Sequence, residues 1–206
     1  AVAAEGRAVE VLSRPPLGPW VVTIDDFLDE GEAERLLAAP GISSNWQRSQ
    51  AGDGVLAART SSTSWCRGAC MRDTTINAVQ DRVQALTRVP PENAEYLQVL
   101  QYHEGQFYKV HHDQNSPRSS AWGPRLYTFF MYLSDDLTGG ETRFPLLNIT
   151  VPPKKGRALL WPSVLSGAPY ERDDRTDHEA LPVKSGTKYA ANYWLHMHPF
   201  RTLSDA

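Results

Sequence analysis

The segment from Lys188 to His198 constrains the fold most, because its side chains alternate in character as those of a β-strand do. One alternate set is apolar, carries large rings and is expected to pack against helices: Tyr189, Ala191, Tyr193, Leu195 and Met197. The other set mixes a cation, an amide, an indole and an imidazole: Lys188, Ala190, Asn192, Trp194 and His196. Polar groups buried without partners are costly. The mixed face therefore predicts the wall of a polar cavity, with a solvent-exposed face as the alternative.

Further strand-like segments fill the second half of the chain, separated by clusters of Gly, Pro, Asp and Ser. In order they are 97–102, 107–113, 125–134, 141–144, 157–161 and 188–198. Many short strands with turn signals between them predict a sandwich or a barrel.

The first half predicts two helices that brace one sheet of this β structure. Its expected elements are a loose lead-in over 1–17, a strand over 20–24, a helix from Asp29 to Pro40, a strand pair within 43–64, and a helix from Asp73 or Thr74 to Pro90. In the second helix Ile76, Val79, Val83 and Leu86 recur at helical spacing. Such a stripe is typical of a helix face that packs on a core.

Length and composition favour a single domain. The chain has 206 residues, of which 41% are hydrophobic, enough for one full core. We expect residues 1–96 to form a helical and β supporting region and residues 97–200 to form the core with the functional site.

A formal charge of −3 gives no electrostatic case for nucleic acid. No apolar run is long enough to span a bilayer, and the first residues lack a signal-peptide pattern.

The two cysteines, Cys66 and Cys70, leave the redox compartment open. They could close one small loop as a disulfide or stay as two reduced thiols. Asn148 begins a glycosylation sequon, a triplet that is also common by chance.

A candidate metal site begins at His111 and Asp113, which would share one face of a strand while His112 points away. An imidazole beside a carboxylate makes two thirds of a facial metal triad, and His178 offers a third ligand far downstream. Two histidines and one carboxylate favour non-haem Fe(II) and oxygen chemistry over a closed structural zinc site. The alternatives are a His-x-Asp pair that arose by chance on a surface strand and a structural His178. His103 and His112 fit positions behind the metal ligands or on the surface.

Several motifs occur in a fixed order: Tyr102-x-x-Gly105-Gln106-x-Tyr108-x-x-His111-x-Asp113, then Gly139-Gly140-Glu141-Thr142, then His178-x-x-x-Pro182-Val183-x-x-Gly186-x-Lys188, then Trp194. Over about residues 97–198 this arrangement resembles the prolyl 4-hydroxylase family, which are Fe(II)- and 2-oxoglutarate-dependent dioxygenases. The resemblance implies a mainly β fold with flanking α-helices around a double-stranded β-helix, or jelly roll. Asp113 argues against a halogenase relative, because such relatives lack the ligand carboxylate.

The resemblance also implies a role for each matched residue. The Fe(II) ligands would be His111, Asp113 and His178. These three residues and Lys188 would form the catalytic set. Four would bind or enclose 2-oxoglutarate: Tyr102, Thr142, Lys188 and Trp194. The cosubstrate is a dianion, so its far carboxylate needs a fixed cation inside a low-dielectric barrel. Tyr102 and Thr142 are also common strand residues for packing reasons.

The activity implied is hydroxylation of prolyl residues in a peptide or protein, with O2 as oxidant, ascorbate as an expected reductant, and decarboxylation of 2-oxoglutarate to succinate and CO2. Peptide contacts are expected from Tyr108, Arg125 and His196, with a surface arginine as the alternative for Arg125. The loops over 46–58 and 114–124 are candidate lids.

The rival functions are a 2-oxoglutarate oxygenase with another acceptor, a non-catalytic jelly-roll binding module, and zinc hydrolysis, which has no need of Lys188. By resemblance the secretory pathway or ER lumen is expected, with the cytoplasm as the alternative. The sequence predicts no oligomeric state.

Overall fold

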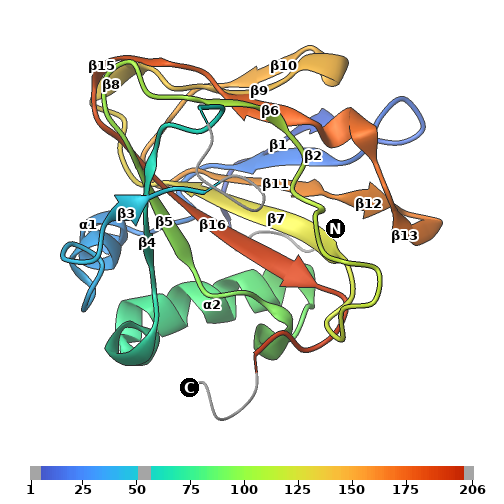
Figure 1. Cartoon of the computed structure of the whole chain (residues 1–206), viewed down its shortest axis with the longest axis horizontal. Coiled ribbons are helices and arrows are strands. Elements are labelled where there is room, and N and C mark those ends of the chain that lie inside the picture. Colours follow the sequence, from blue (N-terminus) through green and yellow to red (C-terminus); the bar gives the residue numbers. More distant parts are fainter. Residues whose placement is uncertain (1–5, 51–56, 202–206) are drawn as a thin grey trace.

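The computed structural model describes residues 6–50 and 57–201. Its largest element is an eight-stranded sheet, with the order β1-β2-β11-β7-β16-β5-β4-β3 (Figure 1). The strands in that order are Val9–Ser13, Val21–Ile24, Ala158–Pro162, Arg125–Tyr132, Lys188–His196, Gln98–Tyr102, Ser62–Trp65 and Gln47–Arg48. Each neighbouring pair is antiparallel. Four of these strands come from the first 96 residues, so the predicted supporting region contributes to the same sheet as the predicted core.

A second, four-stranded sheet with the order β10-β9-β14-β6 faces the first. Its strands in that order are Ile149–Val151, Thr142–Phe144, His178–Ala180 and Tyr108–His111. Two ribbons complete the β structure: β12 (Val164–Leu165) with β13 (Ala168–Arg172), and β8 (Leu137–Gly139) with β15 (Val183–Gly186). Two facing antiparallel sheets confirm the predicted jelly roll.

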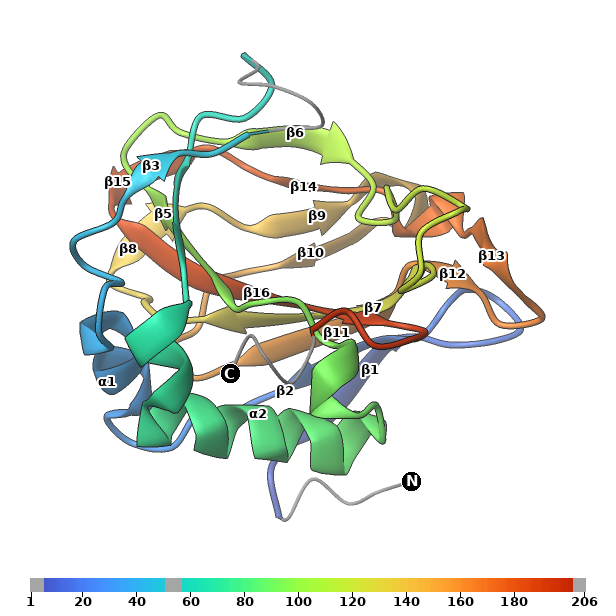
Figure 2. The same cartoon turned by 60° about the horizontal axis from the view of Figure 1, so that its bottom comes forward.

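The helices cover the opposite face of the large sheet (Figure 2). They are α1 (Glu32–Ala38) and α2 (Thr74–Thr87), and the 3-10 turns η1 (Gly68–Arg72) and η2 (Pro91–Asn93) flank α2 along the chain. Two further 3-10 turns belong to the second sheet: η3 (Pro145–Leu147) connects β9 to β10, and η4 (Asp174–Thr176) precedes β14. The α2 helix starts where the sequence predicts, because the Asp73 carboxylate accepts hydrogen bonds from the backbone N–H groups of Thr75 and Ile76, at 2.9 and 3.2 Å.

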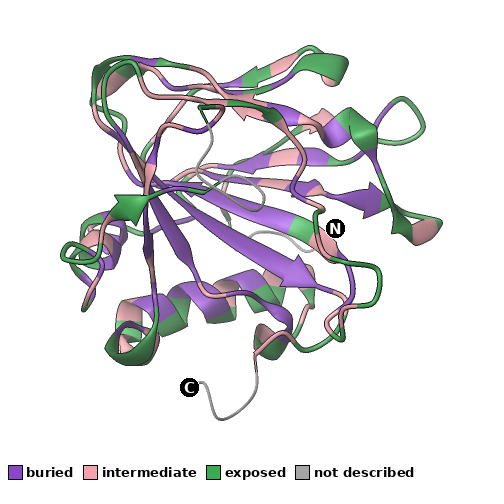
Figure 3. Ribbon diagram, viewed as in Figure 1, coloured by how far each residue is buried: buried purple, intermediate pink, exposed green. Residues whose placement is uncertain are grey.

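Two apolar clusters lie on the two faces of the large sheet. The cluster under the helices includes Leu36, Ile76, Val79, Val83, Ala191, Tyr193 and Leu195. The cluster between the sheets includes Leu100, Tyr102, Phe130, Tyr132, Phe144, Trp161 and Ala190. Figure 3 shows the central strands of the large sheet buried over most of their length. The alternation along β16 therefore separates a helix-facing side from a side that faces the second sheet, as predicted.

Several elements differ from the predictions. The prediction of a loose lead-in is wrong: the segment contains strand β1, whose alternation is weak and whose Val9 and Val11 are both exposed, so that no buried face supports the pattern. Helix α1 begins at Glu32 after Gly31 rather than at Asp29. The Glu32 carboxylate accepts from the Asp29 backbone N–H at 2.7 Å and also pairs with Arg82 of α2 at 2.8 Å. The acidic side chains at this point thus tie the two helices together instead of capping α1.

The remaining departures concern strand ends. The strand predicted over 107–113 ends at His111, so Asp113 lies two residues beyond it. Met197 and His198 likewise fall outside β16. The sequence patterns also missed the short strands β8, β10, β12, β13 and β15, which are two to five residues long. His178 was expected on a further strand, and it begins β14.

Cys66 and Cys70 form a disulfide, and both residues are buried. It closes the turn into η1 just after β4. Asn148 is exposed, and its glycosylation stays a prediction. Among the described residues, no helix is both long and apolar enough to cross a bilayer.

Candidate active site

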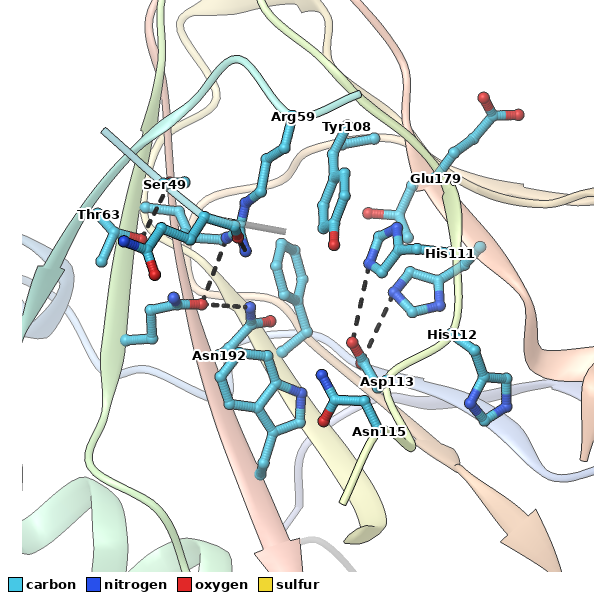
Figure 4. Close-up of a pocket in the computed structure, with 18 of the residues that line it drawn as sticks. Ser49, Arg59, Thr63, Tyr108, His111, His112, Asp113, Asn115, Glu179 and Asn192 are labelled. Atoms are coloured by element: carbon cyan, nitrogen blue, oxygen red, sulfur yellow. Dashed lines mark hydrogen bonds and ion pairs between the residues drawn. The ribbon is translucent and has the colours of Figure 1, made fainter. Parts of the chain in front are cut away.

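Three potential metal ligands converge at the edge of the second sheet. His111 ends β6 and His178 begins β14, and the two residues are direct partners across this antiparallel pair. Asp113 reaches them from the turn after β6: its Oδ1 lies 3.8 Å from His111 Nε2 and its Oδ2 lies 3.6 Å from His178 Nε2. All three ligand atoms lie within 4.8 Å of one another. Figure 4 shows the carboxylate of Asp113 directed toward the ring of His111.

Backbone carbonyls fix both imidazole rings in the same way. His111 Nδ1 lies 2.8 Å from the carbonyl oxygen of Lys109, and His178 Nδ1 lies 3.0 Å from that of Thr176. A carbonyl only accepts, so each Nδ1 carries the proton and each Nε2 keeps its lone pair for a metal. Thr128 on β7 holds the third ligand, because its hydroxyl donates to Asp113 Oδ2 at 2.6 Å.

The charge state of these side chains suits a divalent cation, because metal ligands must be deprotonated. Burial and the nearby His178 lower the pKa of His111 to about 3, so this imidazole is neutral at physiological pH. Burial alone would raise the pKa of Asp113, but the two imidazoles and Arg125 hold it well below its ordinary value. Two imidazoles and one carboxylate, with room for further ligands, fit Fe(II).

A cavity of about 320 Å³ opens beside these residues. It is lined by eight of the ten predicted site residues: Tyr102, Tyr108, His111, Asp113, Arg125, Thr142, His178 and Trp194. Asn192 also lines it, which confirms that the polar face of β16 borders a cavity. The candidate lids reach its mouth through Gln50 and Asn115, although residues 51–56 of the first lid lie outside the described part of the chain.

Lys188 lies behind the wall of this cavity and is fully buried. Its Nζ donates to the carbonyl oxygen of Gly140 at 2.6 Å and lies 5.3 Å and 5.4 Å from the ring centres of Tyr102 and Phe130, which line the cavity. Lys188 forms no ion pair with any acidic side chain in residues 6–50 and 57–201. Burial lowers the pKa of its amine to about 7. Gly140 follows Gly139, a position that only glycine fits, because a Cβ on residue 139 would lie 2.4 Å from the Pro182 carbonyl oxygen.

The wall near Lys188 contains a residue that the sequence patterns missed. Tyr132 on β7 is fully buried, and its hydroxyl donates to Thr142 Oγ1 at 2.8 Å. Period-two spacing from Thr128 would have placed Tyr132 on the same inward face.

The other end of the cavity is polar and aromatic. Tyr108 stacks on His111 with ring centres 3.5 Å apart, and the guanidinium of Arg59 lies 4.6 Å from the Tyr108 ring centre. Arg59 also donates to Gln98 Oε1 at 3.4 Å, and Asn192 donates to the same oxygen at 3.1 Å. The sequence predicts no role for Arg59 or Gln98, because Arg59 reaches the cavity through its bridge to Tyr108 and Gln98 through its pairing with Asn192 of β16.

Arg125 and His196 meet at a buried carboxylate. Arg125 Nε lies 2.5 Å from Glu95 Oε1, and His196 Nε2 lies 2.8 Å from the same oxygen. Arg125 also donates to the Asp113 carbonyl at 2.8 Å, and its guanidinium lies 4.0 Å from the Trp194 ring centre. His196 is buried behind this wall and does not line the cavity.

Comparisons with known proteins agree with this geometry. A family model described as "2OG-Fe(II) oxygenase superfamily" matches residues 97–196. Prolyl 4-hydroxylase 1 of Arabidopsis thaliana is 36% identical over 197 residues, covering 86% of this chain and 69% of the plant protein. Prolyl 4-hydroxylase subunit alpha-3 of Bos taurus is 36% identical over 192 residues, covering 87% of this chain and 34% of the subunit, so the chain spans about a third of that relative.

A solved structure shares the whole architecture. The viral collagen prolyl hydroxylase of Paramecium Bursaria Chlorella virus-1, in its 2OG complex, superimposes with a TM-score of 0.70 at 26% identity. The match covers 94% of this chain and 98% of the viral one. Sequence identity over most of the chain and the His-Asp-His site together show that the chain belongs to the prolyl 4-hydroxylase family of 2-oxoglutarate- and Fe(II)-dependent dioxygenases.

Proposed function

We propose that this chain hydroxylates prolyl residues of a peptide or protein, with His111, Asp113 and His178 as the iron ligands. One observation carries the proposal: a single cavity has a triad of two imidazoles and a carboxylate at its side and, behind its wall, a buried lysine that forms no ion pair among the described residues. A closed zinc site or a simple binding module has no use for that lysine.

Iron and 2-oxoglutarate supply the oxygen chemistry when bound: one atom of O2 enters succinate as CO2 leaves, and the other enters a C–H bond of the acceptor as hydroxyl. The protein contributes placement and a dry site. His111 and His178 keep their Nε2 lone pairs turned inward because their Nδ1 protons are held by carbonyls. Thr128 keeps the Asp113 carboxylate facing them.

Lys188 is proposed to receive the distal carboxylate of 2-oxoglutarate. The amine has no carboxylate partner among the described residues, and burial lowers its pKa to about 7. A bound dianion would stabilise the charged amine in a site from which water is excluded. Tyr102 and Thr142 line the cavity and are proposed to complete this pocket, the Tyr102 ring centre lying 5.3 Å from Lys188 Nζ. Trp194 lines the cavity beside Arg125, six residues further along β16, and is proposed to shape it nearer the metal.

The peptide is proposed to enter past Tyr108 and Arg125, which line the cavity on the metal side. His196 would act on it indirectly, because its ring shares the Glu95 carboxylate with Arg125. Ascorbate is proposed as the reductant that keeps iron in the ferrous state. The buried Cys66–Cys70 disulfide supports an oxidising compartment, such as the secretory pathway.

Mass spectrometry of proline-rich peptides incubated with Fe(II), 2-oxoglutarate and ascorbate tests the acceptor class. We expect a gain of about 16 Da on proline, one oxygen atom, matched by succinate release. The control is Asp113→Ala, which should yield neither product. Oxygen added to another residue type would replace proline as the acceptor. Absence of succinate with every peptide would favour the binding module.

A further inference from the structure

His112, the residue between two proposed metal ligands, has both ring nitrogens engaged. Its side chain is partly buried and lies to one side of the facing Asp113 and His111 (Figure 4). Its Nδ1 lies 2.9 Å from the backbone nitrogen of Gln114, and its Nε2 lies 3.1 Å from the carbonyl oxygen of Asp173. Because the Gln114 N–H donates to Nδ1, the proton of the neutral ring sits on Nε2 and is donated to Asp173.

The two bonds reach two different ligand-bearing segments. Gln114 directly follows Asp113, and its own Oε1 accepts from the Arg125 backbone N–H at 2.8 Å. On the other side, His112 Nε2 also lies 3.1 Å from the Thr176 hydroxyl. The carbonyl of Thr176 is the group that orients His178. The His112 imidazole therefore connects the turn that contains Asp113 to the turn that contains Thr176, whose carbonyl orients His178.

The strand pairing cannot make this connection. The β6–β14 pair fixes His111 against His178, but β6 ends at His111 and leaves Asp113 outside the ladder. Asp173, which accepts the hydrogen bond from His112, is itself held in place. It is buried, its backbone N–H donates to the Ser163 carbonyl at 3.2 Å, and its carboxylate pairs with Arg175 at 2.7 Å.

We propose that His112 is a positioning residue for the metal site: it sets the separation of Asp113 and His178 by joining the turn at residues 112–114 to η4. This role rests on the proposed function, since it requires the triad to bind a metal. Outer partners that orient metal ligands typically change metal affinity about 10–100-fold when removed.

Titration of the metal-free protein with Mn(II), followed by the loss of the free-ion electron paramagnetic resonance signal, tests this role without any turnover. The variants are His112→Ala, His112→Gln and His112→Asn. The Gln amide reaches about as far as the imidazole Nε2 and can restore the bond to Asp173. The shorter Asn amide can accept from Gln114 but cannot reach Asp173. The exposed His198 supplies the matched control, His198→Gln.

We expect His112→Ala to bind Mn(II) about 10–100-fold more weakly, His112→Gln to recover most of the loss, and His112→Asn to recover little. His198→Gln should match the unaltered chain. Titrations run well below every unfolding midpoint separate affinity from folding, because a merely structural role would lower the midpoint and leave the affinity of the folded protein unchanged. If His112→Ala does not fold, the difference in Mn(II) affinity between His112→Gln and His112→Asn still tests the proposal.

Unchanged affinity in His112→Ala, or equal recovery by Asn and Gln, would overturn the role of His112 as a connection. Failure of the unaltered chain to bind Mn(II) would overturn the metal site itself, and the positioning role with it.

Discussion

On the helix side of β16, Tyr193 and Leu195 are buried in the apolar cluster under the helices, and only the Tyr193 hydroxyl has a polar contact, from Arg201, among the described residues. One residue away in each case, Asn192 and Trp194 line the polar cavity. The two sides share one backbone and the same hydrogen-bonded neighbours, β5 and β7. Alternation along a strand thus separates the side chains that hold the sheet to its helices from those that serve chemistry.

The two sides also differ in what they cost the folded state. Apolar burial on the helix side stabilises the protein. On the cavity side, burial of Lys188 lowers the pKa of its amine to about 7, which means that the folded protein binds this proton less readily than the unfolded chain does. The cost to folding therefore grows as the pH falls from about 10.5 toward 7, and it is complete below pH 7. We expect changes on the cavity side to affect function first and changes on the helix side to affect stability first.

The largest effect should come from removing a proposed metal ligand. In Asp113→Ala we expect turnover to fall by more than ~100-fold, beyond the loss typical of an outer partner of a ligand. The midpoint of thermal unfolding of the metal-free protein should change little, because the sheets do not depend on this side chain for packing. Succinate release and thermal unfolding are the measurements. Substantial turnover in the variant would remove Asp113 from the ligand set.

On the helix side the effect should be reversed. Ile76 is fully buried on α2, and Ile76→Ala should lower the free energy of unfolding by about 2–5 kcal/mol. The 2-oxoglutarate requirement should stay the same at temperatures where the variant is folded. Leu17→Ala is the matched control, since Leu17 is 95% exposed. A raised 2-oxoglutarate requirement in Ile76→Ala would show that the two sides of the sheet are coupled.

A smaller and more selective change is expected at the mouth of the cavity. Arg125→Gln should raise the peptide KM about tenfold, equivalent to ~1.4 kcal/mol, while 2-oxoglutarate affinity stays unchanged. The single variant leaves the Glu95 carboxylate buried beside His196 alone. The double variant Arg125→Gln, Glu95→Gln removes that charge and should regain stability but not peptide affinity. An equal loss of 2-oxoglutarate affinity would contradict a peptide role for Arg125.

The smallest expected signal is a proton. With a pKa of about 7, Lys188 is mostly neutral at pH 8, and a bound dianion should draw it back to the charged form. Binding should then take up about 0.9 proton at pH 8, falling toward zero at pH 6. Calorimetry in buffers of different ionisation enthalpy measures this number. In Lys188→Arg the uptake should vanish, because arginine is always charged; equal uptake in both proteins would assign the proton to another group.

Local patterns predicted the features that depend on neighbours in sequence. The two faces of β16, the stripe of α2 and the His111–Asp113 pair each follow from spacing within one segment. The triad formed even though Asp113 lies outside the strand, because the turn after His111 brings the carboxylate back toward the histidines.

Features that depend on distant pairing could not be predicted in this way. Glu95 meets Arg125 and His196 across 30 and 101 residues, so nothing near Glu95 marks it as buried. Arg59 reaches the cavity through a bridge to Tyr108 of β6, far along the chain. Strand β1 alternates only weakly and is held by pairing with β2 at the edge of the sheet, where both of its valines stay exposed.

The most direct test of the contrast between the two sides is a paired measurement on Lys188→Met. Its 2-oxoglutarate titration, followed by succinate release, should show a requirement raised by roughly thirty-fold or more, since losing one member of a desolvated charged pair costs about 2–5 kcal/mol. Lys188→Arg should recover part of that loss. The thermal midpoint of Lys188→Met should fall by no more than about 4 °C, equivalent to ~1 kcal/mol in a chain of this size, or rise as the buried amine is removed. An unchanged 2-oxoglutarate requirement together with a strongly lowered midpoint would make Lys188 a structural residue and contradict the assignment of this side of β16 to the cosubstrate.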